Sequence, residues 1–441
     1  MTSAPSPFVR AALDAAAGVP ATGIAWLDAA RRDHLQRFAA HGLPGARSES
    51  WKYTSLRALS QRAFGLADAD TATNVALAPA LFALPGVDGP RLVFVDGVYR
   101  DDLSARSALE GVSLMPLGAA LATEAEPLRF ALAGRLRHDA DDALAQLNAA
   151  LATDGVVLRV AAGARLASPV HVVHVSSGAQ PDTAWHVRMR VEVGEGAQVD
   201  LVEHYVSAGE GVQLGTVVAD HVVHAGGHLG LVLLQHASAS TTLFRRGHVR
   251  LEANASAIVH ALEVGGALVR HELTAELVGD RARFESRGVF ALDGRQHTDT
   301  QLEVRHEARD TTSDALWRGI ANGRSRGVFR GAIVVAEGAD GSDASLSNKN
   351  LLLSASAEID TKPELEIYAD EVKAAHGATI GQLDERSLFY LRSRGIPLAQ
   401  ARSLLTLAFC RAALESLPNE ALREHLGDLL VAHLPTGPSA D

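Results

Sequence analysis

Strict alternation of apolar and polar residues dominates the middle of the chain. In HVRMRVEV, residues 186–193, the apolar positions are Val187, Met189, Val191 and Val193, and the intervening ones are His, Arg, Arg and Glu. A period of two places successive side chains on opposite faces of a β-strand. Comparable short strands are predicted at residues 156–160, 171–175, 185–193, 199–205, 229–235 and 257–264. Residues 154–385 are therefore predicted to be almost entirely β.

Turn signals of similar composition recur roughly every thirty residues in this region. They are Gly163-Ala164-Arg165-Leu166, Gly196-Ala197-Gln198-Val199, Gly227-His228-Leu229 and Ser256-Ala257-Ile258. A long β region with such turns is compatible with a sandwich, a barrel or a parallel β-helix. The recurrence favours the β-helix, in which each coil stacks on the previous one and buries an aliphatic column.

Helical spacing replaces alternation in the first third of the chain. Residues 8–42 place Leu27, Ala30, His34, Leu35 and Phe38 on one stripe, and Gly42 followed by Pro44 ends the pattern. Residues 117–151 are Ala-rich and again helical. Between these stretches, residues 91–99 predict a hairpin that turns at Asp96-Gly97.

The C-terminal part also has helical spacing. Pro397 opens a helix, and an apolar stripe follows at Leu398, Ala401, Leu404, Leu405, Ala408 and Ala412. Asn419 is a suitable N-cap for a second helix, with a stripe at Leu422, Leu426, Leu429 and Leu430. These helices could either cap the β core or bind a partner.

The patterns together predict four parts. Residues 1–153 form a mostly helical region with a small hairpin, residues 154–385 the β core, residues 386–434 a helical region, and residues 435–441 a disordered tail.

Composition narrows the classes of protein. The net charge is −11, from 41 Lys and Arg against 52 Asp and Glu, which argues against nucleic-acid binding because that requires a basic face. No segment approaches the roughly 20 apolar residues needed to cross a bilayer, and no signal peptide is recognised. Cys410 is the only cysteine, which fits a reducing compartment. A cytoplasmic protein is expected.

Two pairs of histidines share the pattern H-V-V-H, namely His171/His174 and His221/His224. Residues three apart on a strand point to opposite faces, so neither pair can chelate one ion by itself. We expect most of these imidazoles to be solvated or hydrogen-bonded on a polar face.

Motifs of common enzyme classes are absent. The sequence contains no P-loop, no dinucleotide-binding glycine motif between a strand and a helix, and no nucleophile elbow. Cys410 falls in an apolar helix without an evident partner base, so it is predicted to be a small buried residue.

His376 has a different setting, between Ala374-Ala375 and Gly377-Ala378-Thr379. An imidazole among small residues near a strand end is accessible to an ion or to a partner, and it offers a neutral nitrogen near pH 7. A structural histidine at a turn is the alternative.

Three motifs resemble the SufB/SufD family of the SUF iron–sulfur cluster assembly system, and its SufD branch more closely. They are ExWKYT at residues 49–54, DTKPELEIYADEVK-x-x-HGAT-x-G from residue 360 to 381, and RGI-x-x-x-x-A-x-x-LL from residue 394 to 405. The resemblance covers most of the chain. It implies a right-handed parallel β-helix between helical N- and C-terminal regions.

The resemblance also implies partners. Family members act with SufB, a paralogue, and with SufC, an ABC-type ATPase, while a cysteine desulfurase and its sulfur-transfer protein supply sulfur. Clusters form at the interface with SufB, so this chain is expected to be a non-catalytic scaffold and to meet ATP only through SufC. Reduced flavin (FADH2) is associated with the complex, but no flavin motif is found here. An isolated subunit could also form a homodimer.

The histidine of the family's K-x-x-HGAT motif falls on His376, and the resemblance implies that it is a transient iron or cluster ligand opposite a SufB cysteine. Some members carry a cysteine two positions earlier, where this chain has Ala374. The residues expected to face SufB are Glu366, Tyr368, Val372, Thr379 and Ile380. Those expected to face SufC are Pro397, Leu398, Leu404, Leu405 and Phe409.

Two other functions remain open at this point. β-Helices also host polysaccharide lyases and hydrolases, which would show clustered carboxylates or a basic residue along one groove. A purely structural β-helix is the second alternative, and it predicts no effect of histidine substitutions.

Overall fold

The computed structural model describes residues 5–45, 47–106, 109–133 and 142–434. Its α-helices are α1 (Pro7–Ala17), α2 (Ala25–His41), α3 (Arg57–Ser60), α4 (Ala69–Asn74), α5 (Leu117–Ala133), α6 (Ala143–Leu151), α7 (Glu385–Ser393), α8 (Leu398–Arg411) and α9 (Glu420–His433). Its first strands are β1 (Gly65–Leu66), β2 (Arg91–Val95), β3 (Val98–Tyr99) and β4 (Val112–Pro116).

The remaining strands build the β core. They are β5 (Asp154–Val160), β6 (Val170–Ser176), β7 (Thr183–Val193), β8 (Gln198–Ser207), β9 (Gln213–Val223), β10 (His228–His236), β11 (Thr241–Leu251), β12 (Ser256–Val264), β13 (Leu268–Leu277), β14 (Arg283–Leu292), β15 (His297–His306), β16 (Thr312–Ala321), β17 (Arg326–Val335), β18 (Asp343–Leu352), β19 (Glu358–Ile367) and β20 (Lys373–Gly381).

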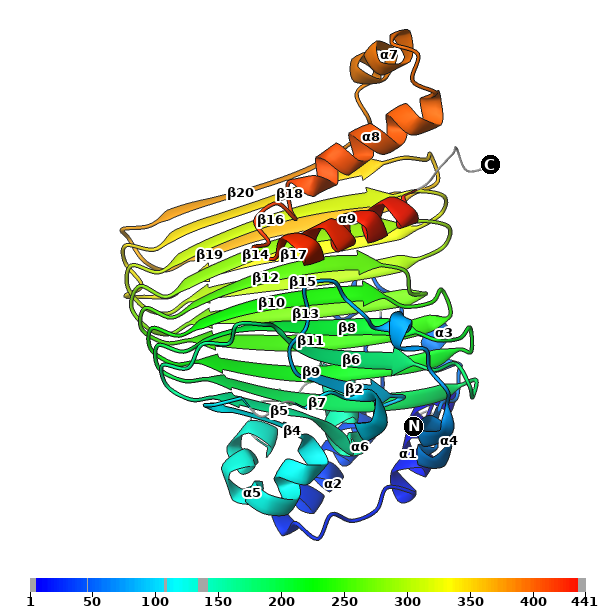
Figure 1. Cartoon of the computed structure of the whole chain (residues 1–441), viewed down its shortest axis with the longest axis vertical. Coiled ribbons are helices and arrows are strands. Elements are labelled where there is room, and N and C mark those ends of the chain that lie inside the picture. Colours follow the sequence, from blue (N-terminus) through cyan, green and yellow to red (C-terminus); the bar gives the residue numbers. More distant parts are fainter. Residues whose placement is uncertain (1–4, 46, 107–108, 134–141, 435–441) are drawn as a thin grey trace.

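These strands alternate between two sheets. Odd-numbered strands from β5 to β19 form one sheet and even-numbered strands from β6 to β20 form the other, and neighbours in each sheet are parallel. His228 pairs with Gln198 on one side and with Ser256 on the other, so one coil takes about 30 residues. Figure 1 shows the coils stacked along the long axis. The predicted parallel β-helix is confirmed, with about eight turns.

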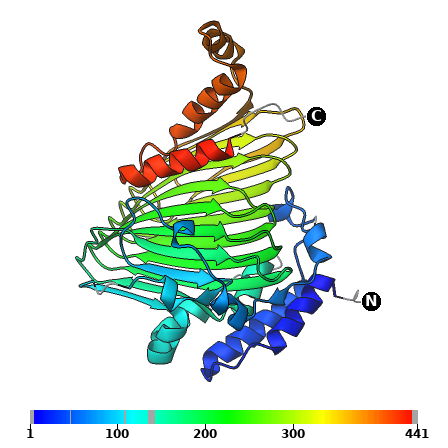
Figure 2. The ribbon, with the colours of Figure 1, turned by 45° about the vertical axis from the view of Figure 1, so that its right-hand side comes forward.

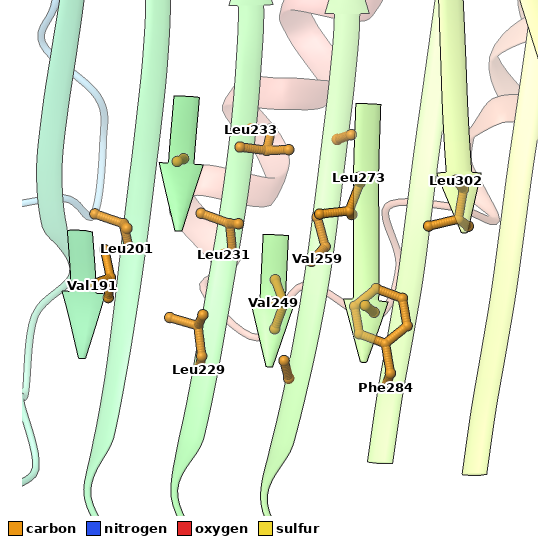
Figure 3. Close-up of a cluster of buried hydrophobic side chains, with 14 of the residues drawn as sticks. Val191, Leu201, Leu229, Leu231, Leu233, Val249, Val259, Leu273, Phe284 and Leu302 are labelled. Carbon is orange, nitrogen blue, oxygen red and sulfur yellow. The ribbon is translucent and has the colours of Figure 1, made fainter. Parts of the chain in front are cut away.

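An aliphatic column fills the interior of the coils. Figure 3 shows Val191, Leu231, Val249, Val259 and Leu302 pointing into it from strands of both sheets, and all of them are buried. The predicted inward face of β7 is confirmed. Its outward residues His186 and Arg188 are buried too, because the N-terminal helices cover this part of the odd sheet.

One corner of the coil repeats a left-handed backbone residue. Asn254, Arg281 and Asp310 have φ of 56°, 60° and 56° there, and Gly341 follows at 76° in the turn before β18. The amide of Gly341 donates to the carbonyl of Glu371 at 2.7 Å, and the earlier corner residues make the same kind of bond one coil further on. These backbone hydrogen bonds align each corner with the corner of the next coil, and the last of them reaches the turn that precedes β20.

The N-terminal region closes one end of the stack. The hairpin of β2 and β3 is confirmed, with positive φ at Asp96 (47°) and Gly97 (79°). Strand β2 pairs with β6 and β4 pairs with β5, so this region also extends both sheets. The predicted helical stretch from residue 117 appears as α5, which breaks at Glu124, and as α6; residues 134–141 lie outside the described residues.

The C-terminal helices lie on and beyond the other end. Helix α9 packs its predicted stripe on the outer face of the even sheet, with Leu422, Leu426 and Leu430 buried. In Figures 1 and 2, α8 leads away from the stack and α7 lies beyond the last coil, at the opposite end from α1. The predicted tail, residues 435–441, lies outside the described residues. The division of the chain into four parts stays a prediction.

Candidate functional site

The β-helix has an open end at β19 and β20. Within the described chain, β19 pairs only with β17 in its sheet and β20 only with β18, whereas the N-terminal region continues the sheets at the other end. Each terminal strand therefore presents unpaired backbone N–H and C=O groups along one edge, which is the arrangement that accepts a further strand.

His376 lies on this edge. It pairs in register with Leu346, whose side chain belongs to the buried column. Paired residues of a parallel sheet project from the same face, so His376 occupies an inward position that the next coil would cover. Because the described residues contain no further coil, His376 is exposed. A Cβ added at the neighbouring Gly377, which points to the opposite face of the strand, would meet nothing within 4 Å, so the outward side of β20 is also uncovered here.

The inward face of the last coil contains one titratable group. The inward positions of β20 are Ala374, His376, Ala378 and Ile380, and those of β18 and β19 are occupied by apolar residues together with Asn348, Asn350 and Thr361. Ala374 lies on the same face as His376. A cysteine at this position would offer a thiolate beside the imidazole, whereas alanine offers only a methyl group. His376 alone can offer an imidazole nitrogen here.

Exposed apolar side chains gather at the same end. Nine large hydrophobic residues of the described chain are exposed, and seven of them lie on β19, β20, α7, α8 or the turn after β19. These seven are Ile367, Tyr368, Ile380, Phe389, Tyr390, Leu398 and Leu404. Such a concentration is typical of a surface that binds another protein.

The residues predicted to face SufB all lie at this end. Glu366, Tyr368, Thr379 and Ile380 are exposed and Val372 is half-buried. Among the residues predicted to face SufC, Pro397, Leu398 and Leu404 are exposed, whereas Leu405 is half-buried and Phe409 packs with the core under α8 and α9. The structure places these groups on two adjoining surfaces, and their contacts with partners stay predictions.

The apolar stripe of α8 mostly faces away from the β-helix. Ala401 is its buried member, while the helix otherwise buries Thr406 and Cys410 against the even sheet. Cys410 is buried as predicted, and burial raises the pKa of its thiol. Helix α7, which was not predicted as a separate element, carries the exposed Phe389 and Tyr390.

We expected most H-V-V-H histidines to be solvated or hydrogen-bonded on a polar face, and none of His171, His174 and His221 is solvated, because all three are buried. His221 is nevertheless hydrogen-bonded, with its Nδ1 3.0 Å from the carbonyl oxygen of His248. Residues of each pair do point to opposite faces. His174 stacks inside the coil on Tyr205 at 5.0 Å, whereas His171 stacks on His204 at 5.5 Å. The prediction failed because both faces of these strands are covered. Burial lowers the pKa of His174 to about 4 and that of His171 to about 3.

His224 fits the expectation of a hydrogen-bonded imidazole. Its Nε2 lies 3.0 Å from Glu192 and its Nδ1 lies 3.2 Å from Glu252, on the outer face of the odd sheet. Desolvation opposes protonation, but the two carboxylates outweigh it and raise the pKa of His224.

Inside the coil lies a buried cluster of charged and polar side chains, in which Glu203 is paired with Arg245 and Tyr205. Glu203 accepts from Arg245 at 2.7 and 2.8 Å and from the Tyr205 hydroxyl at 2.6 Å. Burial alone would raise the pKa of Glu203, but Arg245 and His221 hold it well below its usual range. Paired in this way, the cluster is explained by the need to neutralise buried charge.

Sequence reasoning missed Asn348 and Asn350 on β18, the strand paired with β20, and Thr361 on β19. The sequence did contain a signal for them. Two asparagines occupy inward positions of β18 between Leu346 and Leu352, and the other inward positions of this strand are apolar. A buried amide requires partners, and such a pair therefore marks a place where side chains hold strands together.

The described residues include no cluster of three or more His, Cys, Asp or Glu side chains arranged to hold a metal ion. One exposed imidazole cannot bind iron firmly by itself, so a metal at His376 needs ligands from another chain. None of the helices in the described ranges is both long and apolar enough to cross a membrane.

Comparison with known families covers nearly the whole chain. Residues 174–409 match the model described as "SUF system FeS cluster assembly, SufBD core domain", and residues 14–172 match "SufBD protein N-terminal region". The core match includes the β-helix from β7 onward, the open end and most of α8.

Individual relatives agree with this match. The iron–sulfur cluster assembly protein SufD of Escherichia coli is 31% identical over 409 residues, 92% of this chain and 93% of that protein. A SufBD family protein of Synechocystis is 29% identical over 87% of this chain and 86% of its own length. SufD of Bacillus subtilis is 27% identical over 64% of this chain and 65% of its own length.

Proposed function

The chain belongs to the SufB/SufD family of SUF iron–sulfur cluster assembly proteins, and we propose that it is the SufD-type subunit of a complex with SufB and SufC. One observation carries this proposal. Both sheets end unpaired at the same end of the β-helix, where an exposed imidazole and most of the exposed apolar residues lie together.

SufB is the partner at the open end. It is a β-helix of the same family, so its terminal strands offer the same unpaired backbone groups and can continue one or both sheets. Tyr368 and Ile380 then become buried in the seam, and this burial supplies apolar stabilisation that backbone pairing alone would lack.

His376 acts as one ligand of a transient site at this seam. Iron and sulfide are the cargo, and a SufB cysteine supplies the soft thiolate that this chain does not have at Ala374. An imidazole binds iron less tightly than thiolates hold a finished cluster. A mixed ligand set of this kind suits a cluster that must leave the scaffold.

SufC binds the surface formed by α7 and α8, beyond the last coil. ATP binding and hydrolysis occur in SufC, and movement of α8 transmits force to the end of β18, because Arg402 of α8 donates to the carbonyl of Leu353 just after this strand. Sulfur reaches the seam from a cysteine desulfurase through its sulfur-transfer protein. The chain itself remains a non-catalytic scaffold, and the polysaccharide-acting alternative is not retained.

The test is cluster assembly in a complex reconstituted anaerobically with SufB, SufC, Fe²⁺, cysteine and the desulfurase. A His376→Ala subunit is expected to assemble clusters about tenfold more slowly or worse, while still co-purifying with both partners. His41→Ala is the control, since His41 is an exposed histidine on α2. Assembly at the control rate by the His376 variant would remove this residue from the proposed site.

A further inference from the structure

Two buried amides interrupt the apolar interior just below the open end. Asn348 and Asn350 are 0% and 2% exposed and occupy inward positions of β18. Neighbouring inward positions of the same strand hold Ala344 and Leu346, which belong to the apolar column. Burying an amide is unfavourable unless its donors and acceptors are satisfied.

The amides are satisfied by bonds that join three strands. Asn350 Nδ2 donates to Asn348 Oδ1 at 2.6 Å and to the backbone carbonyl of Thr379 at 3.1 Å. The Thr361 hydroxyl donates to Asn348 Oδ1 at 2.8 Å. Asn348, Asn350 and Thr361, here called the amide brace, therefore connect β18 to β19 and β20.

The space for the brace is built by a glycine one coil below. A Cβ added to Gly319 on β16 would lie 2.2 Å from Asn350 Oδ1 and equally close to the ring of Phe290. Gly319 pairs in register with Asn350, which itself pairs with Ile380 on β20. The absence of a side chain at Gly319 thus lets the amide of Asn350 sit inside the coil and reach the last strand.

Strand β20 needs such a support. It is an edge strand with a backbone partner on one side only, and edge strands fray more readily than central ones. His376 lies three residues before Thr379, the point at which the brace holds the strand. The bonds of the brace join uncharged groups, so they fix β20 without placing a charged side chain on the inward face that carries His376.

We propose that the amide brace is the positioning device for His376, which it holds at the seam by fixing β20 against β18 and β19. The side chains of the brace act through the strand and do not bind the cargo. This role rests on the proposed function of His376, while the mechanical part, the fixing of β20, can be tested independently.

The mechanical test is hydrogen exchange of the full chain. Asn350→Ala removes the bond to Thr379 and is expected to speed exchange of β20 amides about tenfold or more, because the strand then opens more often. Asn322→Ala is the matched control, because Asn322 is also a buried asparagine but bonds to Asp293 at a turn away from β20. Unchanged exchange in β20 of the Asn350 variant would overturn the brace.

The positioning test is a double-mutant cycle with His376→Ala in the reconstituted complex. Asn350→Ala alone is expected to slow cluster assembly about tenfold and to have no further effect in the His376→Ala background. Thr361→Val should behave like Asn350→Ala, and Thr361→Ser, which keeps the hydroxyl, should retain the normal rate. An equal loss with and without His376 would mean a general structural effect and would refute the positioning role.

The two tests separate the proposals. If His376→Ala alone has no effect on assembly, the proposed role of His376 fails and the positioning role fails with it, but hydrogen exchange still decides whether the brace holds β20. If His376 matters and exchange at β20 is unaffected by Asn350→Ala, the brace fails and the proposed function remains.

Discussion

Glu49 and Lys362 form an ion pair in which Lys362 Nζ lies 2.9 Å from Glu49 Oε1, although 313 residues separate them. Each belongs to a segment that resembles a motif of the family, ExWKYT near the start and DTKPE on β19. Lys362 also lies 2.8 Å from Glu364. The N-terminal motif thus forms a strap on the outer face of the odd sheet and reaches the strand that borders the open end.

Thr54 is expected to anchor this strap more firmly than the exposed ion pair does. Its buried hydroxyl donates to Asp299, which is also bonded by Arg270, and lies 3.1 Å from His297 Nε2. Thr54→Val leaves the buried carboxylate with one partner fewer and should lower the free energy of unfolding by about 2 kcal/mol. Denaturant unfolding measures this effect.

Thr73→Val serves as the control for Thr54, since Thr73 is an exposed threonine on α4 that bonds only to a helix carbonyl. It should change stability by less than about 0.5 kcal/mol. Equal effects of the two substitutions would contradict an anchoring role for Thr54.

The fold was accessible from the sequence because its signals are periodic. Alternation identified strands such as β7, and the recurrence of small-residue turns near Gly196 and Gly227 indicated stacking coils. The strands at residues 213–223 and 241–251, and the strands between residues 268 and 352, were not identified individually. The first two show one reason. Their outward positions include apolar residues such as Phe244, which pack under the N-terminal helices and weaken the alternation.

The candidate site was only partly accessible. His376 stood out through its small neighbours and its motif, and its place on an edge strand agrees with that hypothesis. The amide brace depends on which face of β18 points inward, and this could be decided only after the register with β16 and β20 was known. Burial of His171 and His174 likewise depends on helices and strands distant in sequence, which no local pattern reveals.

His174 is expected to make the chain sensitive to acid. Neither of its ring nitrogens has a hydrogen-bond partner among the described residues, and burial lowers its pKa to about 4. In the unfolded chain the His174 imidazole binds a proton below about pH 6.5, whereas in the folded chain it stays neutral until about pH 4. Protonation of the unfolded chain therefore does not reduce stability above pH 6.5, and it reduces stability progressively as the pH falls from 6.5 to 4. Lowering the pH from 8 to 5 should therefore reduce the free energy of unfolding by about 2 kcal/mol through His174.

Replacing His174 with Phe isolates that contribution. The ring lies among Phe94, Tyr205 and Trp185, so an aromatic substitute keeps the stack and removes the titration. The loss of stability between pH 8 and pH 5, measured by denaturant unfolding, should be smaller in the variant by about 2 kcal/mol. Any packing cost of the larger ring affects both pH values alike. The same pH dependence in both proteins would argue against this account.

His224 should have the opposite pH dependence. Its pKa is raised in the folded state because, against desolvation, Glu192 and Glu252 favour the charged form. The stabilisation is therefore complete below about pH 6.5 and is lost as the pH rises through the folded-state pKa. The three side chains are about one third exposed and therefore screened by solvent, so an effect on the order of 0.5 kcal/mol is expected. Comparison with His224→Gln between pH 6 and pH 9 should show the advantage of histidine disappearing at the alkaline end.

The surface proposed for SufC can be tested without disturbing the fold. Leu398 and Leu404 on α8 are 42% and 44% exposed, although they are large and apolar. A double change, Leu398→Asp with Leu404→Asp, should weaken SufC binding by about a hundredfold if both side chains are buried in the contact, while denaturant unfolding stays near the wild-type value. Val431→Asp is the matched control, because Val431 is 46% exposed on α9. The affinity for SufC is measured by calorimetric titration of the wild type, the α8 double variant and the Val431 variant. The same affinity for all three would place the docking surface elsewhere. Weaker binding by the α8 variant alone would support docking of SufC on α8.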